Sequence, residues 1–182
     1  MRTLLLTAAC AAMLASCSPP AQQSEAPSTT DNLPSVVACN TVTPDPAHQI
    51  TIQEAPAAAA AVADLRGGRI TPGVYDLTSA QRVGAATGWP GARAVAVDVA
   101  ENPNGGVTLN WAGTIPGGDV DRWTATLTET PTVRVAYTCG RVGEVDADFA
   151  AAATTLQLRM PDGADGHLVL NFQRSEEHTS EL

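Results

Sequence analysis

The sequence contains no lysine. Its ten basic residues are all arginine and stand against 19 acidic residues, which leaves a formal net charge of −9 over 182 residues. A nucleic-acid partner requires a basic surface that displaces counterions from the phosphate backbone, so this charge balance argues against nucleic acid. Aromatic residues are also scarce, at 4% of the chain. The length suits a single domain with one hydrophobic core.

Familiar catalytic and metal-binding motifs are lacking as well. No serine lies in a nucleophile elbow, and no glycine-rich loop leads from a strand into a helix as a phosphate-binding loop does. The histidines outside the last nine residues, His48 and His167, do not form a pair with metal-binding spacing. We therefore expect a protein that is not an enzyme and that uses neither a metal nor a cofactor.

The first residues have the pattern of a bacterial secretion signal. Arg2 supplies a positive charge, residues 3–14 form an apolar stretch too short to span a bilayer, and small residues follow. The sequence Leu-Ala-Ser-Cys at 14–17 resembles the lipobox of bacterial lipoproteins, in which the cysteine becomes the first mature residue and carries the lipid. We therefore expect a signal peptide at residues 1–16 and lipidation of Cys17, palmitate included; an ordinary signal with a chance cysteine is the alternative.

A lipid on Cys17 predicts attachment to a membrane of the bacterial cell envelope. Ser18 follows the lipidated position, which is compatible with sorting to the outer membrane, facing the periplasm. In that oxidising compartment Cys39 and Cys139 remain after Cys10 is lost with the signal. We expect them to form a disulfide, and a free reactive thiol pair is the alternative.

Composition divides the rest of the chain. Residues 17–35 are rich in Pro, Ser, Thr and Gln and are expected to form a disordered tether after the lipidated cysteine. Residues 36–173 are expected to form the folded domain. Near its start, Ile50–Ile52 favours a short strand, and Pro56–Leu65, an alanine-rich run with proline at its first position, favours a short helix.

A period of two dominates from Gly73 onward, with apolar runs separated by Gly, Pro, Asn and Asp. Most connections have hairpin length and composition, so consecutive runs are expected to be antiparallel neighbours. Pairing of the last strand with the first removes exposed edges and predicts an all-β fold, an eight-stranded antiparallel up-and-down barrel. A β-sandwich is the alternative. The eight predicted strands are 73–83, 93–100, 107–114, 120–128, 132–139, 145–150, 154–160 and 167–172.

The alternation also predicts strand register. Symmetric hairpins place Trp111 opposite Trp123, and Trp123 opposite Tyr137, so that three aromatic residues share one inward row. The adjacent inward row would contain Leu109, Ala125 and Val135. A small residue between two larger ones lets this layer fill without voids.

Two resemblances favour the barrel. Gly73-Val74-Tyr75 resembles the Gly-x-Trp that opens the first strand of lipocalins, although Tyr replaces Trp and the later Thr-Asp-Tyr motif is not found. The chain also resembles small secreted bacterial proteins whose domains open with G-x-Y-x-L-T-S, continue through Y-T-C and close with a T-T-L-x-L segment. Here the first two motifs lie at 73–79 and 137–139, and the third lies within 152–158. The resemblance implies a bacterial lipoprotein with a lipocalin-like barrel and no known reaction.

The last nine residues, RSEEHTSEL at 174–182, differ from everything before them. They show no alternation, contain three glutamates and have no large apolar residue before Leu182. One reverse translation of this segment resembles the adapter that is ligated to DNA fragments in short-read sequencing. We therefore expect the barrel domain to end at Gln173 and the tail to be non-native; a natural acidic tail is the alternative.

One strand carries a row of carboxylates. Glu144, Asp146 and Asp148 alternate with apolar residues and are expected on the outer face. Such a row can hold a cation. The preferred interpretation is a solvated face with Arg134 on the neighbouring strand as an ion-pair partner.

The aromatic residues are the main candidates for a functional site. Trp111, Trp123, Tyr137 and the loop residue Trp89 can stack against a ligand, and the structural alternative is a core layer that fills the barrel. We hypothesise a non-enzymatic, lipid-anchored envelope protein that binds a small apolar or amphipathic ligand. The alternative is a solid-cored scaffold or protein-interaction module of the envelope, and a third hypothesis is a hydrolytic enzyme that depends on a histidine.

Overall fold

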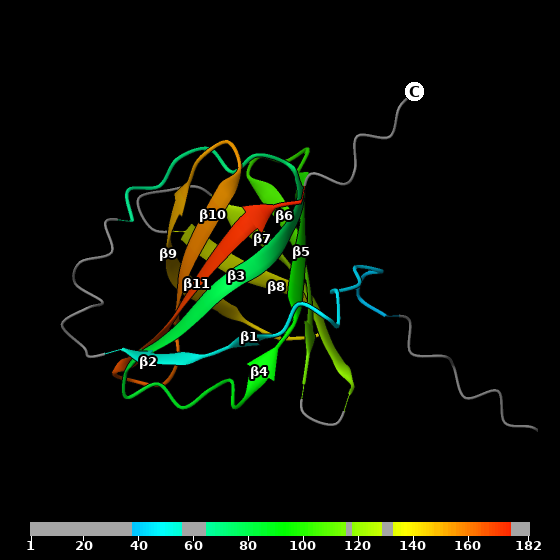
Figure 1. Ribbon diagram of the computed structural model, residues 1–182. Coiled ribbons are helices and arrows are strands. Elements are labelled where there is room, and N and C mark those ends of the chain that lie inside the picture. The colour runs from blue at the N-terminus through cyan, green and yellow to red at the C-terminus, as the bar shows by residue number, and fades with distance from the viewer. Residues whose placement is uncertain (1–37, 56–64, 116–117, 129–132, 176–182) are drawn as a thin grey trace, which may run out of the picture. The chain divides into compact units, whose positions relative to one another are not determined.

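The computed structural model describes residues 38–55, 65–115, 118–128 and 133–175 (Figure 1). All regular elements within these ranges are β-strands, and they belong to one compact unit, Val36–Leu182. The strands are β1 (Ile50–Thr51), β2 (Gln53–Ala55), β3 (Gly73–Gly84), β4 (Ala92–Arg93), β5 (Val95–Glu101), β6 (Val107–Thr114), β7 (Val120–Thr128), β8 (Val133–Cys139), β9 (Glu144–Ala151), β10 (Thr155–Pro161) and β11 (Gly166–Arg174).

Eight of these strands form a closed antiparallel barrel, which confirms the predicted fold. Strands β3 and β5 to β11 each pair with the next strand of the barrel in chain order, and β11 returns to pair with β3. Figure 1 shows this closing pair, with β3 and β11 side by side across the near wall. Because the last strand pairs with the first, neither is left as an edge, and the alternative sandwich is not formed.

Alternation of apolar and polar residues explains the strand positions. In β6 the side chains of Val107, Leu109 and Trp111 are buried, whereas Thr108 and Asn110 between them are partly exposed. Strands β6 and β7 have the bounds predicted for them, and the others differ at their ends. The second predicted strand is divided, with β4 separated from β5 by one residue.

The predicted register holds between β6 and β7 but is wrong between β7 and β8. Trp111 pairs with Trp123, as the symmetric hairpin requires. Tyr137, however, pairs with Ala125 rather than with Trp123. Thr128 pairs with Arg134, which leaves five residues between the paired positions, whereas the predicted pairing leaves three, so the partner of each β7 residue lies two positions further along β8. A displacement by two keeps every side chain on its predicted face.

The neighbouring row is displaced in the same way. Ala125 pairs with Leu109 as predicted, but Val135 pairs with Leu127 instead of Ala125. A second irregularity follows at the end of β8, where Thr124 pairs with Cys139 and the register shifts by one. This shift is a β-bulge, and it turns Cys139 from the inner face of the barrel to the outer face.

Residues 38–55, which we call the N-terminal strap, complete the wall where β3 and β5 diverge. Strand β5 pairs only with the first part of β3, from Gly73 to Asp76. Beyond that point β2 pairs in parallel with Gln81–Val83 of β3, and β1 pairs with β4. Figure 1 shows β1 next to β4 and β2 beside β3. The strand predicted at Ile50–Ile52 is therefore present as β1, whereas the parallel pairing of β2 was not predicted.

One end of the barrel is covered by the chain that precedes β3. Gly67 exchanges backbone hydrogen bonds with β9, donating to the Phe149 carbonyl at 2.8 Å and accepting from Ala151 at 3.0 Å. Ile70 is 2% exposed within the core. The Tyr75 hydroxyl donates to the Thr71 carbonyl at 2.6 Å, which ties this cover to the first barrel strand.

Several predicted features lie outside the described residues. These are the signal peptide, Cys17, the tether, all but the last residue of the predicted helix at 56–65, and residues 176–182. Strand β11 continues to Arg174, and the Ser175 amide donates to the Val74 carbonyl at 2.8 Å. Any residue except proline can donate such a backbone hydrogen bond, so this bond does not show whether the tail is native. The non-native origin of the tail stays a prediction.

The described part of the chain includes no helix with the length and apolar character needed to cross a membrane.

Candidate ligand-binding site

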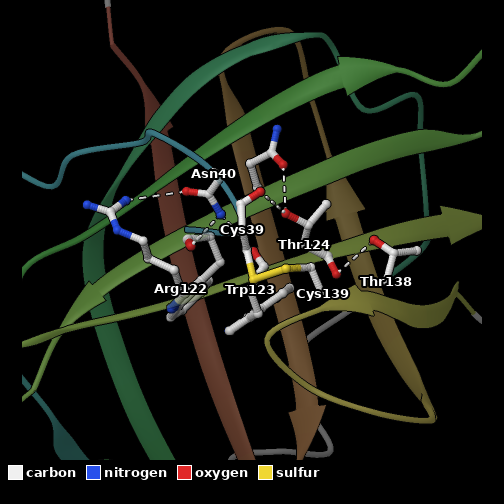
Figure 2. Close-up of a disulfide and its surroundings, with 9 residues drawn as sticks. Cys39, Asn40, Arg122, Trp123, Thr124, Thr138 and Cys139 are labelled. Atoms are coloured by element: carbon white, nitrogen blue, oxygen red, sulfur yellow. Dashed lines mark hydrogen bonds between the residues drawn. A yellow bond between two sulfur atoms is a disulfide. The ribbon is translucent and has the colours of Figure 1, made fainter. Parts of the chain in front are cut away.

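The predicted disulfide joins the N-terminal strap to the barrel. Cys39 and Cys139 are bonded, with their Cα atoms 5.5 Å apart and a sequence separation of 100 residues. Figure 2 shows the bond together with the polar side chains around it. The Thr124 hydroxyl donates to the Cys39 carbonyl at 3.3 Å, and the bulge places Cys139 on the same outer face.

Asn40 connects the strap to the two stacked tryptophans. Its side-chain amide donates to the Trp111 carbonyl at 3.1 Å and to the Trp123 carbonyl at 3.0 Å. Arg122 donates to the Asn40 side-chain oxygen at 3.4 Å (Figure 2). It also donates to the Val42 carbonyl. From outside the barrel, the strap therefore binds the backbone of Trp111 and Trp123, whose side chains point inward.

All four aromatic residues predicted for the site form one cluster. The rings of Trp111 and Trp123 are stacked, with centroids 5.1 Å apart and an angle of 11° between their planes. Trp89 meets Trp111 edge-on at 6.0 Å, and Tyr137 meets Trp123 edge-on at 5.3 Å. The diagonal contact of Tyr137 with Trp123 survives the changed register because large side chains reach across adjacent pairs. Phe172, which sequence reasoning did not select, meets Trp111 edge-on at 6.0 Å.

These four aromatic residues line a cavity of about 280 Å³, which we call the aromatic pocket. The pocket lies at the barrel end opposite the cover formed by Ile70, where β6, β8 and β10 end and β7, β9 and β11 begin. Apolar side chains from β9 to β11 form the facing wall. That wall consists of Val145, Met160, Leu168 and Leu170. The charged residues of the pocket are Arg93, Asp121, Arg141 and Asp162.

Trp89 is held in the pocket in a strained conformation. Among the described non-glycine residues it is the one with a positive φ, at 64°. For a bulky side chain this left-handed conformation costs about 1–2 kcal/mol, and such strain is typical of functional sites. Asp162 holds the loop, because its carboxylate accepts from the Thr87 amide at 2.8 Å and the Gly88 amide at 2.6 Å.

Two arginines lie over the aromatic rings. The Arg93 guanidinium is 5.4 Å from the centroid of Trp89, and that of Arg141 is 5.3 Å from Trp123 and 5.8 Å from Tyr137. Such contacts are attractive because the ring face is electron-rich. The sequence offered no sign of these arginines, since they come from a two-residue strand and from a turn.

The two arginines differ in charge compensation. Arg141 donates to Asp121 at 2.8 Å, with side chains that are 45% and 30% exposed. Within the part of the chain that the structure describes, Arg93 has no carboxylate at ion-pair distance. Burial lowers the pKa of the Arg93 guanidinium, the charge of Asp121 opposes this shift, and the charge of Arg141 adds to it.

Hydrogen-bond donors without partners are concentrated in the same place. The described residues contain four buried side-chain polar atoms that lack a partner, and all four are nitrogen donors. Three of them belong to residues that line the aromatic pocket, namely Trp89 Nε1, Trp123 Nε1 and Arg93 Nε. The fourth is Arg82 Nε. An unpaired buried donor is costly in a protein interior, so three around one cavity indicate a place where acceptors bind.

The carboxylates of β9 form ion pairs with arginines on the neighbouring strands. Arg134 contacts Glu144 at 3.1 Å and Asp146 at 3.4 Å, and Arg159 pairs with Asp148. Across the described ranges, no three or more His, Cys, Asp or Glu residues are placed to hold a metal ion. The row is therefore a set of partly exposed ion pairs, which contribute little to stability.

No protein-family model and no curated protein matches the sequence. Among solved structures, the chain is similar to a de novo designed fluorescence-activating β-barrel, with 10% identity and a TM-score of 0.40 over 58% of this chain and 94% of that chain. A similarity at that level carries no inference about function.

Proposed function

We propose that this protein is a lipid-anchored, non-enzymatic component of the bacterial cell envelope and that its barrel binds a small apolar or amphipathic ligand. The aromatic pocket is the observation that carries the ligand-binding part. A barrel end filled only for stability has no need of a cavity lined by stacked tryptophans and bordered by arginines. Ligand sites are typically apolar cavities with a few converging polar groups.

The strained Trp89 loop supports the same function. A core layer favours relaxed backbone conformations, because strain reduces stability without a compensating gain. Here Asp162 accepts hydrogen bonds from the backbone amides of Thr87 and Gly88, which precede Trp89. The loop is thereby built to present one indole ring to the cavity.

The experiment is native mass spectrometry of the full chain recovered from a bacterial envelope. We expect a reproducible mass in excess of the oxidised, lipidated polypeptide, which tandem dissociation releases as a small molecule. Trp111→Ala, which removes the central ring of the cluster, should abolish the extra mass. A mass that equals the polypeptide and its acyl groups, repeated across envelope extracts, would favour the solid-cored scaffold instead.

The anchor rests on the lipobox-like sequence at 14–17. Metabolic labelling with a palmitate analogue should mark the wild-type chain and not the Cys17→Ser variant. In the same cells the variant should lose its lipid-dependent partition into detergent. Equal labelling of both chains would contradict the assignment of Cys17.

A further inference from the structure

The polar groups of the aromatic pocket indicate which class of ligand it accepts. Its unpartnered buried atoms are Trp89 Nε1, Trp123 Nε1 and Arg93 Nε, and each of them can only donate. No unpartnered buried side-chain acceptor occurs in the described part of the chain. A ligand that satisfies these atoms must therefore carry hydrogen-bond acceptors.

The charged side chains of the aromatic pocket also restrict the class of ligand. Asp121 is paired with Arg141 at 2.8 Å, and one oxygen of Asp162, Oδ2, accepts from two backbone amides, so each carboxylate of the pocket already has donors. Arg93 remains as a cation without a carboxylate at ion-pair distance among the described residues. A guanidinium and an anionic oxygen form a stronger hydrogen bond than neutral partners do. An anionic acceptor fits this pocket better than a neutral one.

The size and shape of the cavity restrict the class of ligand further. A cavity of about 280 Å³ lies just below the range of about 300–1,000 Å³ that is typical of sites for drug-sized ligands. The wall formed by the stacked rings of Trp111 and Trp123 is flat. A planar apolar body of one or two rings suits both the volume and the wall.

We propose that the aromatic pocket binds a small aromatic carboxylate, with its ring against Trp111 and Trp123 and its carboxylate at Arg93 and the free indole N–H groups. The proposal rests on the ligand-binding function proposed above and specifies its ligand class. The anion enters a protein of net charge −9, so recognition depends on this local arrangement and not on a general attraction for anions.

Three matched probes test the charge preference. The full chain, disulfide-bonded and placed in lipid nanodiscs, is titrated by calorimetry with 2-naphthoate, 2-naphthamide and 2-naphthylmethylamine. These probes share one ring system and carry an anion, a neutral amide and a cation, and empty nanodiscs correct for partition into lipid. We expect the dissociation constant of the carboxylate to be at least about tenfold lower than that of the amide, with no binding of the amine.

Two variants assign the preference to the pocket. Arg93→Gln should abolish the advantage of the carboxylate over the amide. The matched control Arg69→Gln should retain it, because Arg69 lies at the covered end of the barrel and pairs with Glu101 at 3.3 Å. Trp123→Phe keeps an aromatic ring but removes one donor, so it should weaken the binding of both the carboxylate and the amide while the barrel stays folded by circular dichroism.

The outcomes separate this proposal from the one on which it rests. Equal affinities for carboxylate and amide, or an unchanged carboxylate preference in Arg93→Gln, would overturn the anion proposal and leave ligand binding in place. If no probe binds and the envelope protein carries no extra mass, both proposals fail.

Discussion

Trp89 and Asp162 show how single residues shape the pocket. The carboxylate of Asp162 accepts hydrogen bonds from two backbone amides of the loop that leads to Trp89, and Trp89 is only 7% exposed despite its loop position. The strained backbone of Trp89 is maintained by these contacts and by burial of the ring. The loop and the ligand site should therefore be weakened together.

Asp162→Ala tests this dependence. Loss of two charge-assisted hydrogen bonds should lower the free energy of unfolding by about 1.5 kcal/mol, a value at the low end because the carboxylate is partly exposed. The emission of Trp89 should shift to longer wavelength as the loop loosens. Urea unfolding and fluorescence spectra measure both effects, and Asp165→Ala, an exposed aspartate of the same turn, should leave both unchanged.

Tyr75 is the residue whose ionisation should affect stability. Its side chain is fully buried, and this burial raises the pKa of its hydroxyl above 10.0, opposed by the charge of Arg174 and by the hydrogen bond to Thr71. The unfolded chain therefore loses this proton at a lower pH than the folded chain does. The contribution is fully present below the pKa of the unfolded tyrosine and is lost as the pH rises through the folded value.

We predict that the wild-type chain loses stability above about pH 10 and that the Tyr75→Phe variant loses less stability over the same range. At pH 8 the variant should be less stable by about 0.5–1.5 kcal/mol, because the bond to the Thr71 carbonyl is gone. Urea midpoints at pH 8, 9.5 and 10.5 measure the difference between the two chains. A constant difference over this range would contradict the role given to Tyr75.

At the scale of elements, the N-terminal strap supports the pocket at two points. Asn40 binds the carbonyls of Trp111 and Trp123, and β1 pairs with Arg93 through Ile50. The disulfide at Cys39 keeps the beginning of the strap in place. The strap therefore links a covalent bond on the outer face to the side chains that line the pocket.

Replacing both Cys39 and Cys139 by alanine should release this element. A bond that closes a loop of 100 residues is expected to contribute about 3–5 kcal/mol, mainly by restricting the unfolded chain. Urea unfolding should show this loss, and ligand affinity should fall as Arg93 and the tryptophans lose support. Reductant should lower the stability of the wild-type chain to that of the double variant and leave the variant unaffected.

For the whole molecule, the pairing that closes the barrel is extensive. The pairing of β3 with β11 extends from Gly84 to Tyr75 and joins the two ends of the folded sequence. An antiparallel sheet of the same strands without this pairing would expose two long edges. The outer pairing of β1 with β4, by contrast, involves only two residue pairs.

Hydrogen exchange distinguishes these pairings. Amides of β3 and β11 should exchange only through global unfolding, as slowly as those of β6 and β7, because a closed barrel has no fraying edge. Amides of β1 and β4 should exchange faster. Exchange monitored by mass spectrometry at several urea concentrations measures this, and early exchange of β11 would indicate an open sheet.

Much of this fold could be predicted from the sequence. The alternation in β6 and β7 located both strands, assigned Trp111 and Trp123 to the interior and paired them correctly. The pairing of Tyr137 was wrong because the length of a connection does not reveal how many of its residues remain unpaired. Most of the polar half of the site was not predicted, since Arg93, Arg141, Asp121 and Asp162 lie on separate turns and strand ends.

The sequence by itself determined the strands, their inward faces, the closed barrel, the disulfide partners and the aromatic candidates. These follow from local periodicity and from the small number of cysteines, which one chain displays without reference to its fold. Only the tertiary structure decided the bulge that turns Cys139 outward, the place of the strap, and the meeting of Arg141 with Trp123. The physical reason is that these features depend on how separate segments pack in space, and no local sequence pattern encodes those distances.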